Sequence, residues 1–213
     1  MSLNRSFHGS GAPTAAFRRP APSRPVFDFT ERMREVCVDM IARTPELVHV
    51  DMTRVAVSFC QARNRASYGV FASLTPLRFR DGALSEKRRR RTYQVQRLFD
   101  RNGQEMLYIL SFYLPRFMDL DLKEKLITIL HELWHIGTQF DGDLRRHAGR
   151  CYAHTHSKAE YDARMEELAD RWLAQQPPES LWAFLRHNFD GLIAANGRVV
   201  GVKIPRPKLI PVP

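Results

Sequence analysis

Two histidines and a glutamate stand close together in the segment HELWH at residues 131–135. Positions i and i+4 of a helix are neighbours on one face, so the imidazoles of His131 and His135 can both reach one metal ion. Glu132 follows the first histidine directly and can take a proton from a water bound to that ion. The pattern H-E-x-x-H is typical of a zinc-dependent hydrolase, so Zn²⁺ is the expected cofactor and Glu132 the expected catalytic residue.

The residues around this motif predict the helix that must position it. Apolar side chains recur at helical spacing over residues 121–139, and Asp121 and Glu124 have the spacing of a capping box. The motif therefore lies in the middle of an expected, largely buried helix. Two histidines placed there without a metal would leave several polar nitrogens in the core in need of partners. This setting favours a metal site over a chance match.

A catalytic zinc site commonly has three protein ligands and one open position for water, so a third ligand must come from another part of the chain. His147 is favoured, because it follows His135 across a polar loop in which Gly142 and Gly149 allow the chain to fold back. Glu166, in the next expected helix, remains an alternative.

Other polar residues after the motif could also contribute to the site. His154 and His156 are further candidates for the third ligand, and Asp170 could orient a ligating histidine. A hydrolase of this kind often has an additional donor that stabilises the oxyanion. The sequence does not choose among the candidates for that donor, which are Tyr152, Tyr161, His154 and His156.

The length and composition of the chain indicate how it is organised and in which compartment it is expected. The chain has 213 residues, enough for one globular domain with a proper core. It contains no apolar run of the length needed to cross a bilayer and no signal-peptide-like start, so no membrane association is expected. Three cysteines without a C-x-x-C pair argue against a disulfide framework and indicate a reducing, cytoplasmic setting.

The formal net charge is +10 and is unevenly distributed, with basic residues in 1–25, in the run 87–91 and near the end of the chain. Such segments favour phosphate backbones, which makes DNA or RNA a possible partner. Solvated tails and a solvated loop explain the same charges equally well. No aromatic residues alternate with the basic ones as they would in a platform for stacking bases.

The pattern along the chain predicts one α+β domain. Residues 1–25 are expected to be a disordered basic arm, 26–196 the folded domain, and 197–213 a Pro-rich tail with a short strand near 199–204. A small antiparallel sheet is expected to pack against the motif helix and further helices. The expected helices cover 27–43, 121–139, 157–174 and 179–195, and the expected strands cover 55–60, 68–79, 92–99 and 105–113, the last two joined by a hairpin turn at 100–103.

The segments HELWH at 131–135 and FDGDLRRHAG at 140–149 resemble the SprT/Spartan-type and phage-encoded metallopeptidases of the zincin group. The order of helix, strands and motif helix over roughly residues 30–175 is also similar to theirs. The resemblance implies a zincin-like fold in which His131, His135 and His147 bind zinc and Glu132 is catalytic. The pattern E-x-x-A-D at 166–170 is similar instead to the zincins whose third ligand is glutamate.

These observations lead to three functional hypotheses. The first is a zinc metallopeptidase that hydrolyses peptide bonds through a water activated by Glu132, and that could act on proteins bound to nucleic acid, as SprT-like enzymes do. The second is a nucleic-acid-binding or regulatory module with a structural metal, against which the retained Glu132 argues. The third is a zinc hydrolase acting on RNA, whose known family resembles this chain less because it lacks the glutamate. Oligomeric state and peptide specificity are not determined by the sequence.

Overall fold

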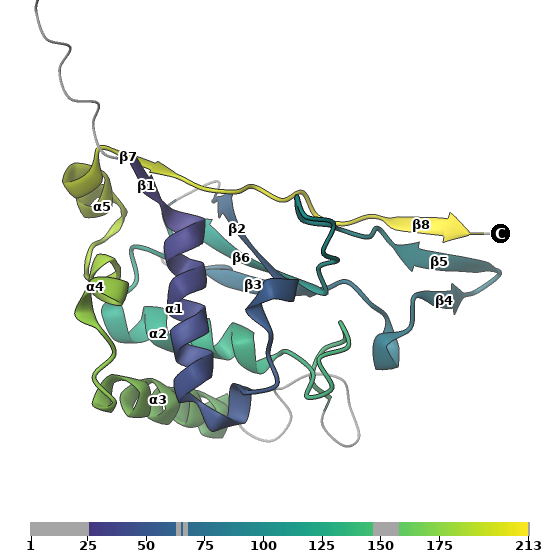
Figure 1. Cartoon of the computed structure of the whole chain (residues 1–213), viewed down its shortest axis with the longest axis horizontal. Helices are drawn as coiled ribbons and strands as arrows, with labels where there is room; N and C mark the ends of the chain where they lie inside the picture. The colour runs from purple at the N-terminus through teal and green to yellow at the C-terminus, as the bar shows by residue number, and fades with distance from the viewer. Residues whose placement is uncertain (1–25, 63–64, 66–67, 147–157, 213) are drawn as a thin grey trace, which may run out of the picture.

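The computed structural model describes residues 26–62, 65, 68–146 and 158–212. These residues form five α-helices and three small β-sheets, which confirms the expected α+β class. Figure 1 shows the helices gathered at one side of the molecule and a narrow sheet extending from the other. Within the described part of the chain, no helix combines the length and the apolar character that crossing a membrane requires.

The central sheet has the strand order β2–β6–β3, with β2 at Val55–Gln61, β6 at Tyr108–Leu114 and β3 at Ala72–Pro76. The expectation of a purely antiparallel sheet was wrong, because β6 pairs parallel with β2 and antiparallel with β3. Six of the seven β6 residues are buried, so this strand is stable only between two neighbours and under cover on both faces.

The two faces of the central sheet bury different clusters, because successive side chains of a strand point to opposite sides. Tyr108, Leu110 and Phe112 of β6 belong to the main core, whereas Ile109 packs with Leu77 and Met106 in a smaller cluster on the other face. Ile204, from near the C-terminus, packs against the smaller cluster.

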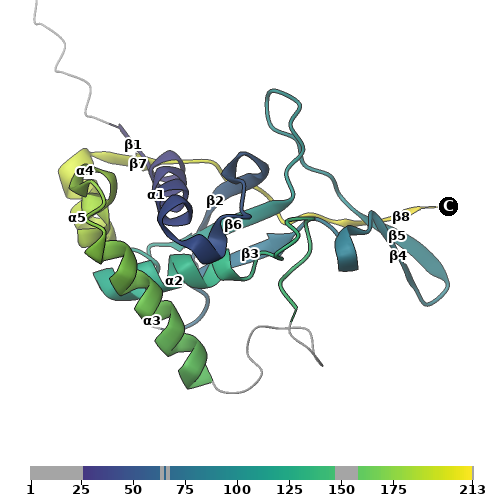
Figure 2. The ribbon, with the colours of Figure 1, turned by 60° about the horizontal axis from the view of Figure 1, so that its bottom comes forward.

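Three helices cover the main-core face. α1 (Phe29–Arg43) lies over β2, α2 (Leu122–Trp134) lies over β3, and α3 (Lys158–Ala174) packs on the outside of α2 (Figures 1 and 2). The Trp172 indole of α3 donates a hydrogen bond to Asp39 of α1 at 2.8 Å, which joins the first and third helices. This layer fixes α2, the helix that carries the motif, against the edge of the sheet.

A second three-stranded sheet contains the basic run. Its order is β4–β5–β8, with β4 at Ser85–Arg88, β5 at Arg91–Val95 and β8 at Leu209–Val212. The expected hairpin around residues 100–103 is reduced to a single bridge between Phe99 and Glu105. The strand expected at 92–99 pairs instead with β4 and β8, because the residues of 85–95 are too polar to enter the buried central sheet.

The C-terminal part of the chain closes the fold. The single helix expected at 179–195 is broken into α4 (Glu179–Trp182), a 3₁₀ turn (Ala183–Arg186) and α5 (Phe189–Asn196). The break occurs because His187 is extended and the Asn188 side chain caps α5. β7 (Arg198–Val200) then pairs parallel with β1 (Val26–Asp28), so residues beyond 196 contribute to the folded structure.

Lys125 of α2 is buried, with only 1% of its surface exposed. Its ammonium donates to the backbone carbonyls of Leu185 at 2.8 Å and His187 at 2.9 Å, which ties α2 to the C-terminal segment. Burial lowers the pKa of Lys125 to about 8, although Asp119 and Asp121 oppose the shift. A cation buried without a carboxylate in contact costs stability whenever it is charged.

We predict that the difference in unfolding free energy between the wild-type protein and Lys125→Met rises between pH 7 and pH 10.5. The unfolded chain holds the lysine proton up to the ordinary pKa of 10.5, whereas the folded protein releases it near 8. The unfolded state therefore binds more protons in this window, and wild-type stability rises with pH by up to about 3 kcal/mol relative to the variant. Urea unfolding of the wild-type protein and of Lys125→Met across this pH range tests the prediction. If the unfolding free energies of the two proteins changed in parallel with pH, the prediction would be contradicted.

Candidate metal centre

The motif helix α2 begins as the sequence predicts. Asp121 caps it by accepting from the Glu124 backbone N–H at 2.7 Å, and the Glu124 side chain accepts from the Asp121 N–H at 3.1 Å. This reciprocal capping box fixes the helical register of everything that follows. The helix ends at Trp134, five residues before the expected end, because the chain turns at His135 and Gly137 donates to the Asp143 carbonyl instead.

The structure places both histidines of the motif at the C-terminal end of α2. The imidazoles of His131 and His135 are half-buried, and their ring centroids are 4.7 Å apart at an interplanar angle of 77°. Two imidazoles this close can share one metal ion. Glu132, between them in sequence, is buried with 9% of its surface exposed.

Glu132 is held against the edge of the central sheet. Burial raises its pKa to about 7, and a hydrogen bond from the Leu74 backbone N–H partly opposes that shift. Phe71 and Leu77 flank β3 and are bonded to the β6 side of the sheet, since the Tyr113 N–H donates to the Phe71 carbonyl and the Leu77 N–H donates to the Leu107 carbonyl. Bonding alternates along an antiparallel strand, so the backbone groups of the even-numbered residues between them point away from β6. The Leu74 N–H therefore points from the outer edge of the sheet toward the carboxylate of Glu132.

Tyr161 of α3 packs against both histidines. Its ring centroid lies 4.9 Å from that of His131 and 6.3 Å from that of His135, and its hydroxyl donates to the His131 backbone carbonyl at 3.4 Å. Burial raises the pKa of Tyr161 well above its ordinary value, so its hydroxyl remains protonated at neutral pH. Of the four sequence candidates for an oxyanion donor, Tyr161 is the one that the described residues include.

The loop after α2 returns the chain to the histidine pair. The Tyr108 hydroxyl accepts from the Gly142 N–H at 3.0 Å and donates to the Asp143 carbonyl at 2.8 Å, both in the protein interior. The Asp143 carboxylate in turn accepts from the Leu144 N–H at 2.8 Å. These bonds bring Arg145 back to the helix, where its N–H donates to the His135 carbonyl at 2.8 Å.

The favoured third ligand, His147, and the alternatives His154 and His156 lie outside the described residues, as does Tyr152. Among residues 26–62, 65, 68–146 and 158–212, no three His, Cys, Asp or Glu side chains form a group able to hold a metal ion. The described chain nevertheless reaches Arg146, one residue before His147, directly after the contact with His135.

Glu166, the acidic alternative, lies away from the histidine pair. Its carboxylate is 2.5 Å from the ammonium of Lys123, in the first turn of α2, and its side chain is 52% exposed. Lys123 precedes His131 by eight residues, which is about 12 Å along a helix. Asp170 pairs with the same lysine at 3.4 Å, so the structure does not bring it to a histidine either.

Two residues that position the site were missed from the sequence. Leu74 had no recognisable signal, because its role depends on a backbone N–H at a sheet edge that only strand pairing defines. Tyr108 lies in a buried strand, where a tyrosine needs a partner for its hydroxyl; that need could have indicated a bond to a nearby loop.

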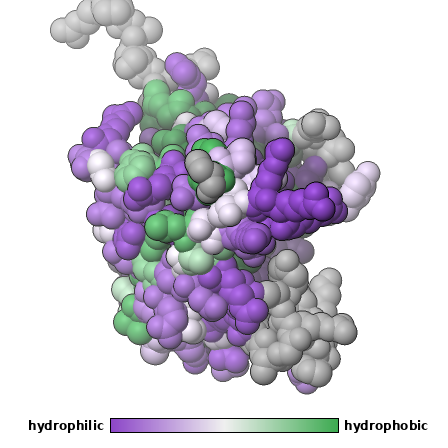
Figure 3. All heavy atoms as spheres, turned by 90° about the vertical axis from the view of Figure 1, so that its right-hand side faces the viewer, coloured by the Kyte–Doolittle hydropathy of each residue, from purple (hydrophilic) through white to green (hydrophobic). Residues whose placement is uncertain are grey.

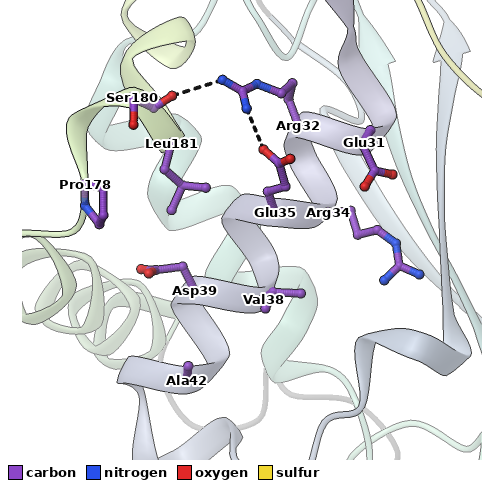
Figure 4. Close-up of a pocket in the computed structure, with 10 residues that line it drawn as sticks. All are labelled: Glu31, Arg32, Arg34, Glu35, Val38, Asp39, Ala42, Pro178, Ser180 and Leu181. Carbon is purple, nitrogen blue, oxygen red and sulfur yellow. Dashed lines mark hydrogen bonds and ion pairs between the residues drawn. The ribbon is translucent and has the colours of Figure 1, made fainter.

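An open pocket of about 550 Å³ lies elsewhere, between α1 and the start of α4 (Figure 4). Two of the charged side chains that line it, Arg32 and Glu35, are paired with each other at 2.7 Å, and Arg32 also donates to the Ser180 carbonyl at 3.1 Å. None of the residues that line it belongs to the motif helix or to the loop after it. This pocket is separate from the candidate metal centre.

A family model described as "Putative phage metallopeptidase" matches residues 29–158, which is more than half of the chain and includes the motif helix and the loop after it. No curated protein and no solved structure gives a significant match.

We predict that Tyr108→Phe destabilises the loop that returns to His135. The change removes the hydroxyl and leaves the buried Gly142 N–H and Asp143 carbonyl without that partner, which costs about 1–3 kcal/mol of unfolding free energy. Denaturant unfolding measures the loss. Tyr93→Phe in β5 is the matched control because Tyr93 lies in the other sheet. Equal stability of the two variants would contradict the role assigned to Tyr108.

Proposed function

Because this chain belongs to the phage metallopeptidase family, we propose that it is a zinc-dependent peptidase in which Glu132 activates the attacking water. The observation that carries the proposal is the combination of two adjacent imidazoles, 4.7 Å apart, with a buried carboxylate whose pKa is raised to about 7. A general base works best when its pKa is near the operating pH. A purely structural metal site has no use for a carboxylate buried at such a cost.

The donor set fits a zinc ion, because imidazole nitrogens are common ligands of that metal. Zinc, when bound, polarises the substrate carbonyl and lowers the pKa of a coordinated water. Glu132 then accepts the proton of the attacking water and delivers it to the leaving amine. The Leu74 N–H holds the Glu132 carboxylate in place, and the Tyr161 ring limits the movement of both imidazoles.

The edge of β3 supports a peptide as the substrate. β3 is an outer strand of the central sheet, and the backbone groups of its even-numbered residues point away from β6, beside Glu132. Because Glu132 takes the Leu74 N–H and Pro76 has no N–H, a peptide there would use the Ala72 N–H and the backbone carbonyls. An extended peptide can add to such an edge through main-chain hydrogen bonds, largely independently of its sequence. That arrangement would place a peptide bond next to the carboxylate.

His147 is proposed as the third ligand. The hydrogen bond from Arg145 to the His135 carbonyl brings the chain to the histidine pair two residues before His147. Glu166, in contrast, is half-exposed and paired with Lys123 near the other end of α2. The action on nucleic-acid-bound proteins suggested by the charge is a separate proposal, which depends on a surface distant from the motif.

We predict that Glu132→Gln abolishes peptide hydrolysis while zinc remains bound. The amide keeps the size of the side chain but cannot accept the proton of the attacking water, and loss of general base catalysis typically costs 10²–10⁴-fold in rate. Hydrolysis of a denatured protein substrate and zinc content by atomic absorption are measured on the same preparation. Full activity in the variant would refute the catalytic role of Glu132.

We predict that His147→Ala loses stoichiometric zinc and that Glu166→Ala retains it. Removing a ligand should weaken zinc binding by more than the roughly 10–100-fold seen when an outer-shell partner is lost. Glu166→Ala is the matched control, since it breaks only an exposed ion pair with Lys123. Zinc retained by His147→Ala and lost by Glu166→Ala would reverse the assignment.

A further inference from the structure

The β4–β5 hairpin, residues 85–95, carries four consecutive arginines at its tip. Arg88 and Arg91 are the last paired residues of the two strands, and Arg89 and Arg90 form the two-residue turn between them. All four are exposed. Figures 1 and 2 show this sheet extending away from the helical layer, and Figure 3, seen from that side, shows strongly hydrophilic side chains projecting from the face. We refer to residues 85–95 as the arginine hairpin.

Two features of the arginine hairpin destabilise its own fold. Arg88 and Arg91 lie directly opposite each other, on the same face of the sheet, and like charges in such a pair are destabilising. Arg89 adopts a positive φ of 58°, a conformation for which turns of this length prefer glycine or asparagine. Arg88 is compensated by its ion pair with Glu86 and by the Phe79 ring, over which its guanidinium lies at 5.4 Å. The positive φ at Arg89 remains a violated local preference, for which a functional reason is expected.

The carboxylates near the arginine hairpin are too few to neutralise most of its positive charge. Residues 85–96 and 202–212, which include β4, β5 and β8, contain eight basic residues and one acidic residue, Glu86, which pairs with Arg88 at 2.5 Å. Glu105, at the base of the sheet, is already engaged by Arg97 and Arg78, both at 2.6 Å. The tip therefore presents guanidinium groups to solvent.

We propose that the arginine hairpin binds the phosphate backbone of duplex nucleic acid. Guanidinium groups donate in a planar fork that matches phosphate oxygens, and the run has four arginines to one lysine. The sheet is three-stranded as far as the Thr92–Val212 pair, and only its tip beyond that pair is two-stranded. A two-stranded ribbon is narrow enough to enter the major groove of DNA. A membrane surface fits less well, because residues 87–91 contain no apolar side chain to insert among lipids. The proposal does not depend on the peptidase function.

The double variant Arg89→Gly/Arg90→Ser in the full chain tests the proposal. A Gly-Ser turn favours the hairpin and relieves the positive φ, so the melting temperature should not fall. Binding to a short labelled DNA duplex, followed by fluorescence anisotropy, should weaken on the order of tenfold at low salt. The slope of log affinity against log salt should also decrease by about two, one for each lost phosphate contact.

The control variant Arg186→Gln/Arg198→Gln removes two exposed charges outside the β4–β5–β8 sheet, one from the 3₁₀ turn after α4 and one from β7, and should bind within about twofold of the wild type. Equal losses in both double variants would show that only net charge matters and would overturn the proposal. Absence of duplex binding by the wild-type protein would also overturn it, as would hairpin-dependent binding to anionic lipid vesicles without binding to duplex. Parallel titrations with DNA and RNA duplexes distinguish the two sources of phosphate, and tighter binding to either supports the proposal.

Discussion

The burial of Glu132 is the constraint on which the rest of the candidate centre depends. A carboxylate in an apolar helix is costly to ionise, and the raised pKa of Glu132 reflects that cost. One backbone N–H, from Leu74, offsets part of it, and a cation held by His131 and His135 would offset more. The sheet edge, the motif helix and the covering ring of Tyr161 each make sense as parts of one site that keeps this carboxylate dry, oriented and close to two imidazoles.

The elements packed around the motif helix, rather than the motif itself, fix the positions of the side chains in that site. α2 lies between the central sheet and α3, and Lys125 fastens it to the C-terminal segment through two backbone carbonyls. On the far side, the Tyr108 hydroxyl fixes the loop that brings Arg145 to His135. The motif helix, the strand edge and the loop are thus held by separate hydrogen bonds, and those of Lys125 and Tyr108 satisfy groups that would otherwise be buried without a partner.

Glu132 and the arginine hairpin both depart from what stability alone would favour, and they differ in kind. Glu132 is a buried charge in a core that could have been apolar, and its surroundings are shaped to tolerate it. The arginine hairpin is the reverse, an exposed element in which like charges face each other across two strands and a positive φ falls on an arginine. The cost of burying Glu132 is compatible with chemistry inside the fold. The cost of the arginine hairpin is compatible with recognition of a partner at the surface.

Local signals in the sequence were sufficient for the motif helix, its capping box and the pair of histidines on one face, because these depend on residues within four positions of one another. The α+β class and helix α1 also followed from local periodicity. Strand pairing did not follow from local periodicity. Competition between segments for buried positions decides the parallel β2–β6 pair, the separate sheet of β4, β5 and β8, and the early end of α2. For the same reason only the tertiary structure brought Leu74 to Glu132, Tyr161 to both imidazoles and Glu166 to Lys123, since each contact joins elements far apart in the chain.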